Sequence, residues 1–123
     1  MSFNAELLNT ILCSTFTLDT GVARVWTFQA PTFPTQIVAF QYAADACDAT
    51  DNPIAVLSVN GDTRMTGVAQ TSADTVQKIT TADTGKSLVV AADAKIQITL
   101  TYGGTAANVR GLVVQLFLKA YLP

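Results

Sequence analysis

The side chains that most often carry enzyme chemistry are scarce in this chain. Histidine is absent, and Glu6 is the only glutamate. Without imidazole there is no Ser-His-Asp or Cys-His activation of a nucleophile, no histidine general base and no histidine metal ligand. We therefore expect no catalytic residues and no enzyme activity. The other carboxylates belong to Asp19, Asp45, Asp48, Asp51, Asp62, Asp74, Asp83 and Asp93.

These aspartates lie almost wholly in segments with the composition of turns, where their side chains cap backbone amides. Asp45, Asp48 and Asp51 have a spacing that could gather oxygen ligands around Ca²⁺. Their loop lacks the alternating ligands, the turn glycine and the closing glutamate of an EF-hand. Two interpretations stay open, a solvated acidic loop and a cation site. We expect the acidic loop, and therefore no metal and no cofactor.

The charge balance limits the possible partners. The net charge is -2, and the few basic residues are scattered, so we expect no nucleic-acid binding.

Only 13% of the residues are charged and 50% are hydrophobic, whereas about 25% are charged in an ordinary soluble domain. A membrane-spanning helix needs ~20 uninterrupted apolar residues, and the longest candidate, residues 112–122, contains Gln115 and Lys119. We expect other protein copies, and no membrane, to cover the apolar surface.

The start of the chain, "MSFNAELLNTILC", lacks the basic region of a secretory signal. We therefore expect the protein to be made and used without export through a cleaved signal. In such a chain Cys13 and Cys47 are expected to be reduced, and a disulfide between them is the alternative.

Short alternating runs of β-branched and aromatic residues, bounded by Gly, Asn, Asp and Pro, indicate about eight strands. Asn60 and Gly61 can both adopt the positive φ of a type I′ turn, which predicts a hairpin between residues 54–59 and 63–69. This pattern predicts an all-β protein with a single antiparallel β-sandwich, jelly-roll-like in topology. We expect an N-terminal arm or short helix in residues 1–12 and the sandwich in residues 13–123.

The last segment, "VRGLVVQLFLKAYLP", carries large apolar residues on both faces of a predicted strand. One face has Leu112, Val114, Leu116, Leu118, Ala120 and Leu122, and the other has Val113, Phe117 and Tyr121. A helix is the alternative, but Gly111 and the neighbouring valines favour a strand. We expect the first face to pack in the core and the second to meet a neighbouring subunit.

The aromatic residues of the segment 22–30 allow three interpretations. Arg24, Trp26 and Phe28 share one face of the predicted strand. They are inward core residues, part of a subunit interface, or a platform on which a sugar stacks. The residues that we place at an interface are Phe3, Leu7, Leu8, Arg24, Trp26, Val113, Phe117 and Tyr121.

A short, histidine-free, Thr- and Ala-rich chain with few charges and this two-faced strand resembles the decoration, or cement, proteins of tailed-bacteriophage capsids. The resemblance is carried by "TGKSLVVAADAK" and "KIQITLTYGGTAANVRGLVVQLFLKAYLP". It implies a homotrimer, made in the host cytoplasm, that sits on the outer surface of the virion and bridges major capsid protein subunits without catalysis. A non-catalytic module of a phage tail or fibre, or a carbohydrate-binding β-sandwich, is the alternative, and an enzyme is a third.

Overall fold

The computed structural model describes residues 11–20 and 23–121, which form two antiparallel β-sheets. The strands are β1 (Ile11–Thr20), β2 (Arg24–Gln29), β3 (Thr35–Ala43), β4 (Asn52–Val59), β5 (Asp62–Thr66), β6 (Gln77–Ile79), β7 (Val89–Val90), β8 (Lys95–Gly103) and β9 (Arg110–Ala120). Within these residues the helical content is a single 3₁₀ turn, η1 (Ala106–Asn108). None of the helical structure described there is long and apolar enough to cross a membrane.

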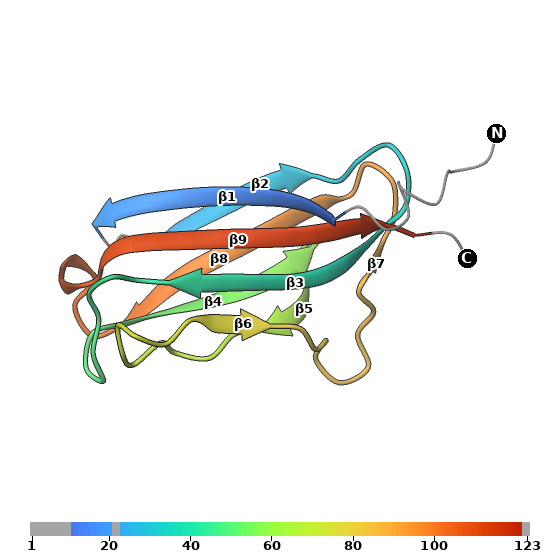
Figure 1. The fold of residues 1–123 in the computed structure, drawn as a ribbon. Coiled ribbons are helices and arrows are strands. Elements are labelled where there is room, and N and C mark those ends of the chain that lie inside the picture. Colours follow the sequence, from blue (N-terminus) through green and yellow to red (C-terminus); the bar gives the residue numbers. More distant parts are fainter. Residues whose placement is uncertain (1–10, 21–22, 122–123) are drawn as a thin grey trace.

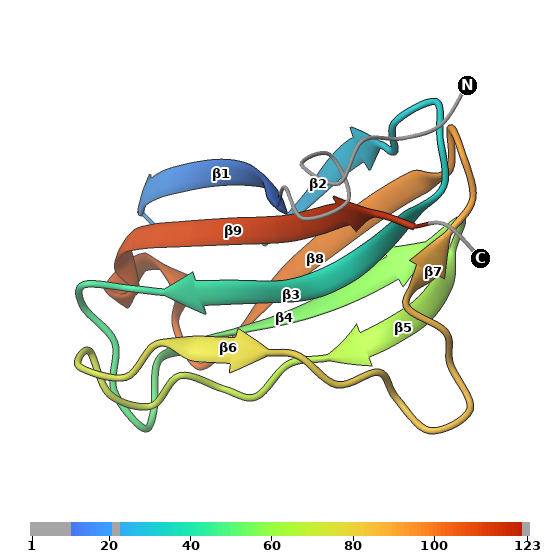
Figure 2. The same cartoon turned by 45° about the vertical axis from the view of Figure 1, so that its right-hand side comes forward.

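The two sheets face each other as layers of a sandwich (Figures 1 and 2). One sheet has the strand order β1-β9-β3-β6, with β7 added beside β3, and the other has the order β2-β8-β4-β5. Successive strands thus alternate between sheets at β1-β2, β2-β3 and β3-β4, which is the connectivity of a jelly roll. The predicted all-β sandwich is confirmed.

The hairpin predicted from Asn60 and Gly61 joins β4 to β5. Both residues have a positive φ, 49° and 84°, as a type I′ turn requires. The Asn60 side chain accepts a hydrogen bond from the backbone N–H of Lys95 at 2.9 Å. The turn is therefore also tied to the start of β8.

The core lies between the sheets and is filled from inward positions of both. The last segment is a strand, as predicted, and Leu112, Val114, Leu116 and Leu118 are buried. Leu122 lies outside the described residues. Other large core residues are Trp26, Ile37, Phe40, Tyr42, Leu57, Met65, Ile96, Ile98 and Leu100.

The lateral side of the sandwich formed by β5 and β6 is closed by a loop of the same chain. The backbone N–H of Asp83 donates to the carbonyl of Arg64 at 2.8 Å, and the Asp83 carboxylate accepts from the N–H of Thr66 at 3.0 Å. The loop after β6 therefore covers the edge of β5. Lys86 and Arg64 both pair with Asp62, at 2.7 and 2.8 Å, and hold this loop against the hairpin.

A buried glutamine joins the two sheets on this closed side. The side chain of Gln70 accepts from the N–H of Ala44 at 2.7 Å and donates to the carbonyls of Ala44 and Ser72. Its backbone N–H donates to the carbonyl of Pro53, in β4, at 3.0 Å. Gln70 thus connects the end of β3 to the opposite sheet.

Candidate functional site

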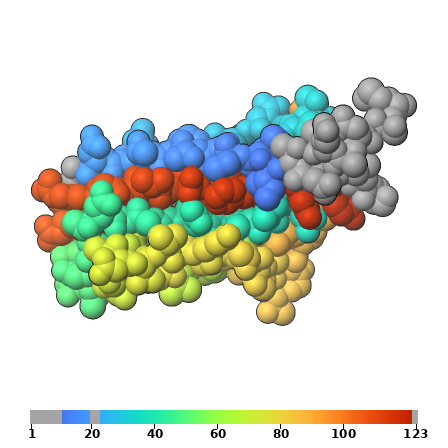
Figure 3. Space-filling view, viewed as in Figure 1, coloured from blue at the N-terminus to red at the C-terminus, as the bar shows by residue number. Residues whose placement is uncertain are grey.

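The outer face of the β1-β9-β3-β6 sheet has no other element of the described chain over most of its length (Figure 3). On β9 this face carries Val113, Gln115, Phe117 and Lys119. Val113 is 36% exposed, and Phe117 is half-buried between the neighbouring strands, opposite Cys13 on β1 and Ala39 on β3. The second face of β9 is therefore turned outward, as its residue pattern predicted.

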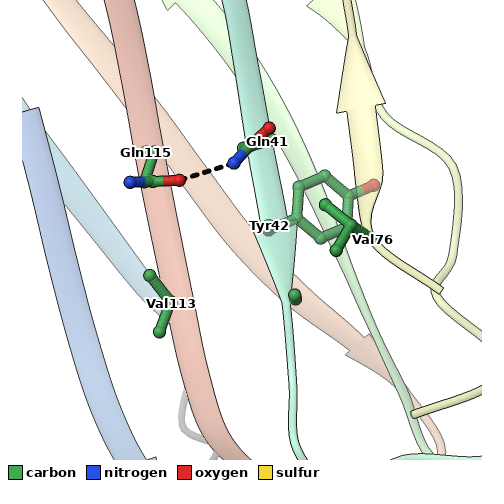
Figure 4. Close-up of a pocket in the computed structure, with 6 residues that line it drawn as sticks. Gln41, Tyr42, Val76, Val113 and Gln115 are labelled. Atoms are coloured by element: carbon green, nitrogen blue, oxygen red, sulfur yellow. Dashed lines mark hydrogen bonds between the residues drawn. The ribbon is translucent and has the colours of Figure 1, made fainter. Parts of the chain in front are cut away.

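A shallow hollow of about 210 Å³ lies in this face. Its floor and walls come from β3, β9 and the segment before β6, and Figure 4 shows its labelled side chains. It contains two amides and two exposed valines, and no charged group. The residues that line it are Gln41, Tyr42, Ala43, Val76, Val113 and Gln115.

The two amides of the hollow are coupled. Gln41 pairs with Gln115 in the β3-β9 register, and Gln41 Nε2 donates to Gln115 Oε1 at 2.5 Å. Gln115 Nε2 in turn donates to Thr15 Oγ1 on β1 at 3.4 Å. Hydrogen-bonded polar groups therefore cross three strands, and their mutual bonds fix the orientation of both amides.

Trp26 is a core residue, in agreement with the first of its three interpretations, and it is not available on the surface of this chain as an interface residue. Its ring is only 8% exposed and stacks on Phe16 with a centroid distance of 5.8 Å. Phe16 also contacts the edge of Phe28 at 4.8 Å. The strand alternation turns Trp26 inward because it lies opposite the buried Ile98 of β8. An inward ring of this kind offers no platform for a sugar.

The other residues placed at an interface have different positions. Arg24 is exposed at the start of β2, and Tyr121 is half-buried just after β9. Phe3, Leu7 and Leu8 lie outside the described residues, together with most of the expected arm. Of that arm, Ile11 and Leu12 are seen, and both belong to β1.

The acidic loop uses its carboxylates as turn caps. Asp48 Oδ1 accepts from the N–H groups of Thr50 and Asp51, both at 2.8 Å. Asp51 accepts from the N–H of Thr105 at 2.6 Å and from Asn108 Nδ2 at 3.0 Å. Among the described residues no group of three or more His, Cys, Asp or Glu side chains lies together as metal ligands would. The geometry therefore favours the acidic-loop interpretation.

We expect Asp51→Asn to destabilise the protein at neutral pH. The hydrogen bond from Thr105, and then that from Asn108, lower the pKa of Asp51. The ionised Asp51 carboxylate stabilises the folded protein above the aspartate pKa of the unfolded chain, about 3.9. This stabilisation is lost as the pH falls through the pKa of Asp51 in the folded protein, which is lower. Melting temperatures of Asp51→Asn and wild type should differ at pH 7, and the difference should shrink as the pH falls below the aspartate pKa of the unfolded chain. Asp74→Asn, in another exposed turn, is the control, and a constant difference across this range would contradict the prediction.

Both cysteines are free. Cys13 is exposed on the outer face of β1, and Cys47 is half-buried in the acidic loop. Burial, and then the charge of Asp48, raise the pKa of the Cys47 thiol. The expectation of two reduced thiols thus agrees with the structure.

No protein-family model and no curated protein matches this chain. A solved structure described as "EclA C-terminal domain; sugar-binding protein" is similar to it with 8% identity and a TM-score of 0.44, over 89% of this chain and 79% of that one. A structure of infectious bursal disease virus Gt strain is similar with 11% identity and a TM-score of 0.29, over 90% of this chain and 38% of that one. Neither likeness carries an argument about function.

Sequence reasoning missed the hollow and its two glutamines. Gln41 and Gln115 are 74 positions apart, and their meeting depends on the β3-β9 register. The available signal was that each is a polar residue between two large apolar residues of its strand. Such residues mark positions on an outward face, but they do not reveal their partners.

Proposed function

We propose that this protein is a non-catalytic binding module that recognises its target with the outer face of the β1-β9-β3-β6 sheet. The observation that carries the proposal is the hollow between β3 and β9, where exposed Val76 and Val113 flank the oriented amides of Gln41 and Gln115. An apolar patch with a few fixed polar groups has the composition of a recognition surface.

We favour a structural role for this binding module, in which it decorates the outer surface of a phage capsid. The partner is then the major capsid protein, and copies of this chain, in a trimer or another closed assembly, lie on the virion. This form is supported by the open face around Phe117 and Val113, because a weakly charged and partly apolar sheet suits a large protein surface.

Carbohydrate binding is the second candidate. It is favoured by the paired amides, since each amide presents both donors and an acceptor to hydroxyl groups. The volume of about 210 Å³ lies below the roughly 300–1,000 Å³ of ordinary small-molecule pockets, so the hollow would hold only part of a glycan. The aromatic stacking expected of many sugar sites would have to come from a residue other than Trp26.

Binding to capsids assembled from the major capsid protein of the same genome tests the favoured form. We expect the protein to co-sediment with these particles, and Val113→Asp to weaken binding at least tenfold, because a charge would be desolvated in the contact. Val25→Asp is the matched control, since Val25 is an exposed valine on the outer face of the opposite sheet. Its affinity should stay at the wild-type value.

The results separate the two candidates. Equal binding by wild type and Val113→Asp, or no sedimentation with capsids, would overturn the capsid form. A glycan array probed with wild type and Gln41→Ala tests the second candidate. Binding that Gln41→Ala abolishes would favour carbohydrate recognition, and an array without signal would reject it.

A further inference from the structure

The lateral side of the sandwich opposite the closed one is formed by β1 and β2. Within the described residues β1 pairs only with β9, and β2 pairs only with β8. Strand β1 is the longer of the two, with 10 residues against 6. Figure 1 shows both strands along the same border of the molecule. An edge of this length presents a row of backbone N–H and C=O groups that can accept another strand.

The edge strands on the closed side, β5 and β6, carry the protection that β1 lacks. β5 is covered through Asp83, as described above, and its pairing with β4 contains an irregularity near Ser58. β6 has only 3 residues and includes Lys78. Short length, a lysine, a bulge and a covering loop are the usual means of preventing edge pairing. From Ile11 to Leu18, β1 has no charged residue, proline or glycine.

The inward side of β1 is also poorly covered by its own molecule. Leu12, Ser14, Phe16 and Leu18 lie opposite buried residues of β9, so they point toward the sandwich interior. Yet Leu12 is 38% exposed and Phe16 and Leu18 are only half-buried. A partner placed beside β1 would remove this apolar surface from water.

We propose that β1 pairs with β1 of a second copy of this chain, antiparallel and about a two-fold axis at Thr15. This register places Leu12 opposite Leu18 and Ser14 opposite Phe16 on the inward side, and Cys13 opposite Thr17 on the outward side. In this register the leucines pair with each other, and the inward side gains apolar contacts across the axis. With no charge between Ile11 and Leu18, two identical edges approach without repulsion, which is why the occupant is a second copy.

This pairing rests on the proposed function and extends it. It would join the two β1-β9-β3-β6 sheets into one continuous sheet with both hollows on the same outer face. A target with repeated sites would then be bound twice, and the second contact would gain from effective concentration. The predicted assembly is two-fold, and it differs in mass from the homotrimer that the capsid resemblance implies.

Light scattering on the full chain tests the pairing. We expect a species of twice the 13.0 kDa chain mass, and at least tenfold weaker dimerisation for Thr15→Lys, which would place two lysines opposite each other on the axis. Thr15→Glu should dissociate the dimer in the same way. An equimolar mixture of Thr15→Lys and Thr15→Glu should restore it, because the opposed charges then attract.

Thr17→Lys is the matched control. The two substituted residues would lie four positions apart along the strands, about 14 Å, beyond the screening length of about 8 Å at physiological salt. Thr17→Lys should therefore remain dimeric. Circular dichroism checks that each variant is folded.

Cross-linking tests the register directly. Thr15→Cys in a background with Cys13→Ser and Cys47→Ser should form an intermolecular disulfide on oxidation, whereas Thr27→Cys on β2 in the same background should not. Three results would overturn the pairing. The wild type could be monomeric at high concentration, it could form a trimer that Thr15→Lys leaves intact, or the mixed variants could fail to associate. Each of these results leaves the Val113→Asp capsid test unaffected, so the two proposals fail separately.

Discussion

Leu116→Asp is expected to abolish folding, whereas Phe117→Asp leaves a folded protein that binds its target poorly. Leu116 is 1% exposed at the centre of β9, between β1 and β3. The substitution removes a buried leucine, at about 2–5 kcal/mol, and also buries a carboxylate without a partner. The combined loss is comparable to the whole stability of an ordinary domain, about 5–15 kcal/mol.

Phe117 has a different environment although it is the next residue. It points to the outer face and is only half-buried, so a carboxylate at this position keeps contact with water. Urea unfolding followed by circular dichroism should give a cooperative transition for Phe117→Asp and none for Leu116→Asp. Similar transitions for both variants would mean that the two faces of β9 are equally buried, and this would remove the basis for an external partner.

Gly67→Ala is expected to cost about 3 kcal/mol, the upper part of the range for overpacking. A Cβ at this position would collide with the carbonyl oxygen of Ala55 and with the hydroxyl of Tyr42. Neither can easily withdraw, because the Gly67 N–H donates to the same Ala55 oxygen at 2.8 Å and the Tyr42 hydroxyl donates to Val68. The free energy of unfolding from denaturant titration measures the effect.

A double-mutant cycle with Tyr42→Phe separates the two collisions. If the hydroxyl contributes to the clash, the double variant should be more stable than the sum of the single effects allows. Val68→Ala is a neighbouring control with an exposed side chain, and it should change stability by less than about 0.5 kcal/mol. A Gly67→Ala protein as stable as this control would show that β4 and Tyr42 can move apart.

Much of the fold was accessible from local patterns. The alternation of β8 and β9 predicted their inward residues, and Asn60-Gly61 predicted the β4-β5 turn, because both signals depend on residues within a few positions of one another. The placement of β9 between β1 and β3 was not accessible, because it joins segments about 75 to 100 positions apart. Local periodicity contains no information about such pairings.

The candidate site was predicted in part. Val113 and Phe117 were correctly placed on an outward face, because the opposite face of the strand carries the longer run of large apolar residues. Trp26 kept three interpretations because period assigns residues to two faces without saying which is inner, and the presence of Ile98 opposite it was needed to decide. The Gln41-Gln115 contact additionally required the register beyond the irregularity between Ile37 and Ala39.

The central position of β9 bears on how the molecule is made. β9 is the last strand in chain order, yet it forms the ladders on which both β1 and β3 depend. During synthesis β1 and β3 leave the ribosome well before β9, so this sheet cannot assemble until β9 has also emerged. Folding of this sheet is therefore expected to follow that of β4, β5 and β8 and to finish only once β9 is available. Until then the apolar strands waiting for β9 need a chaperone or a low protein concentration to avoid aggregation.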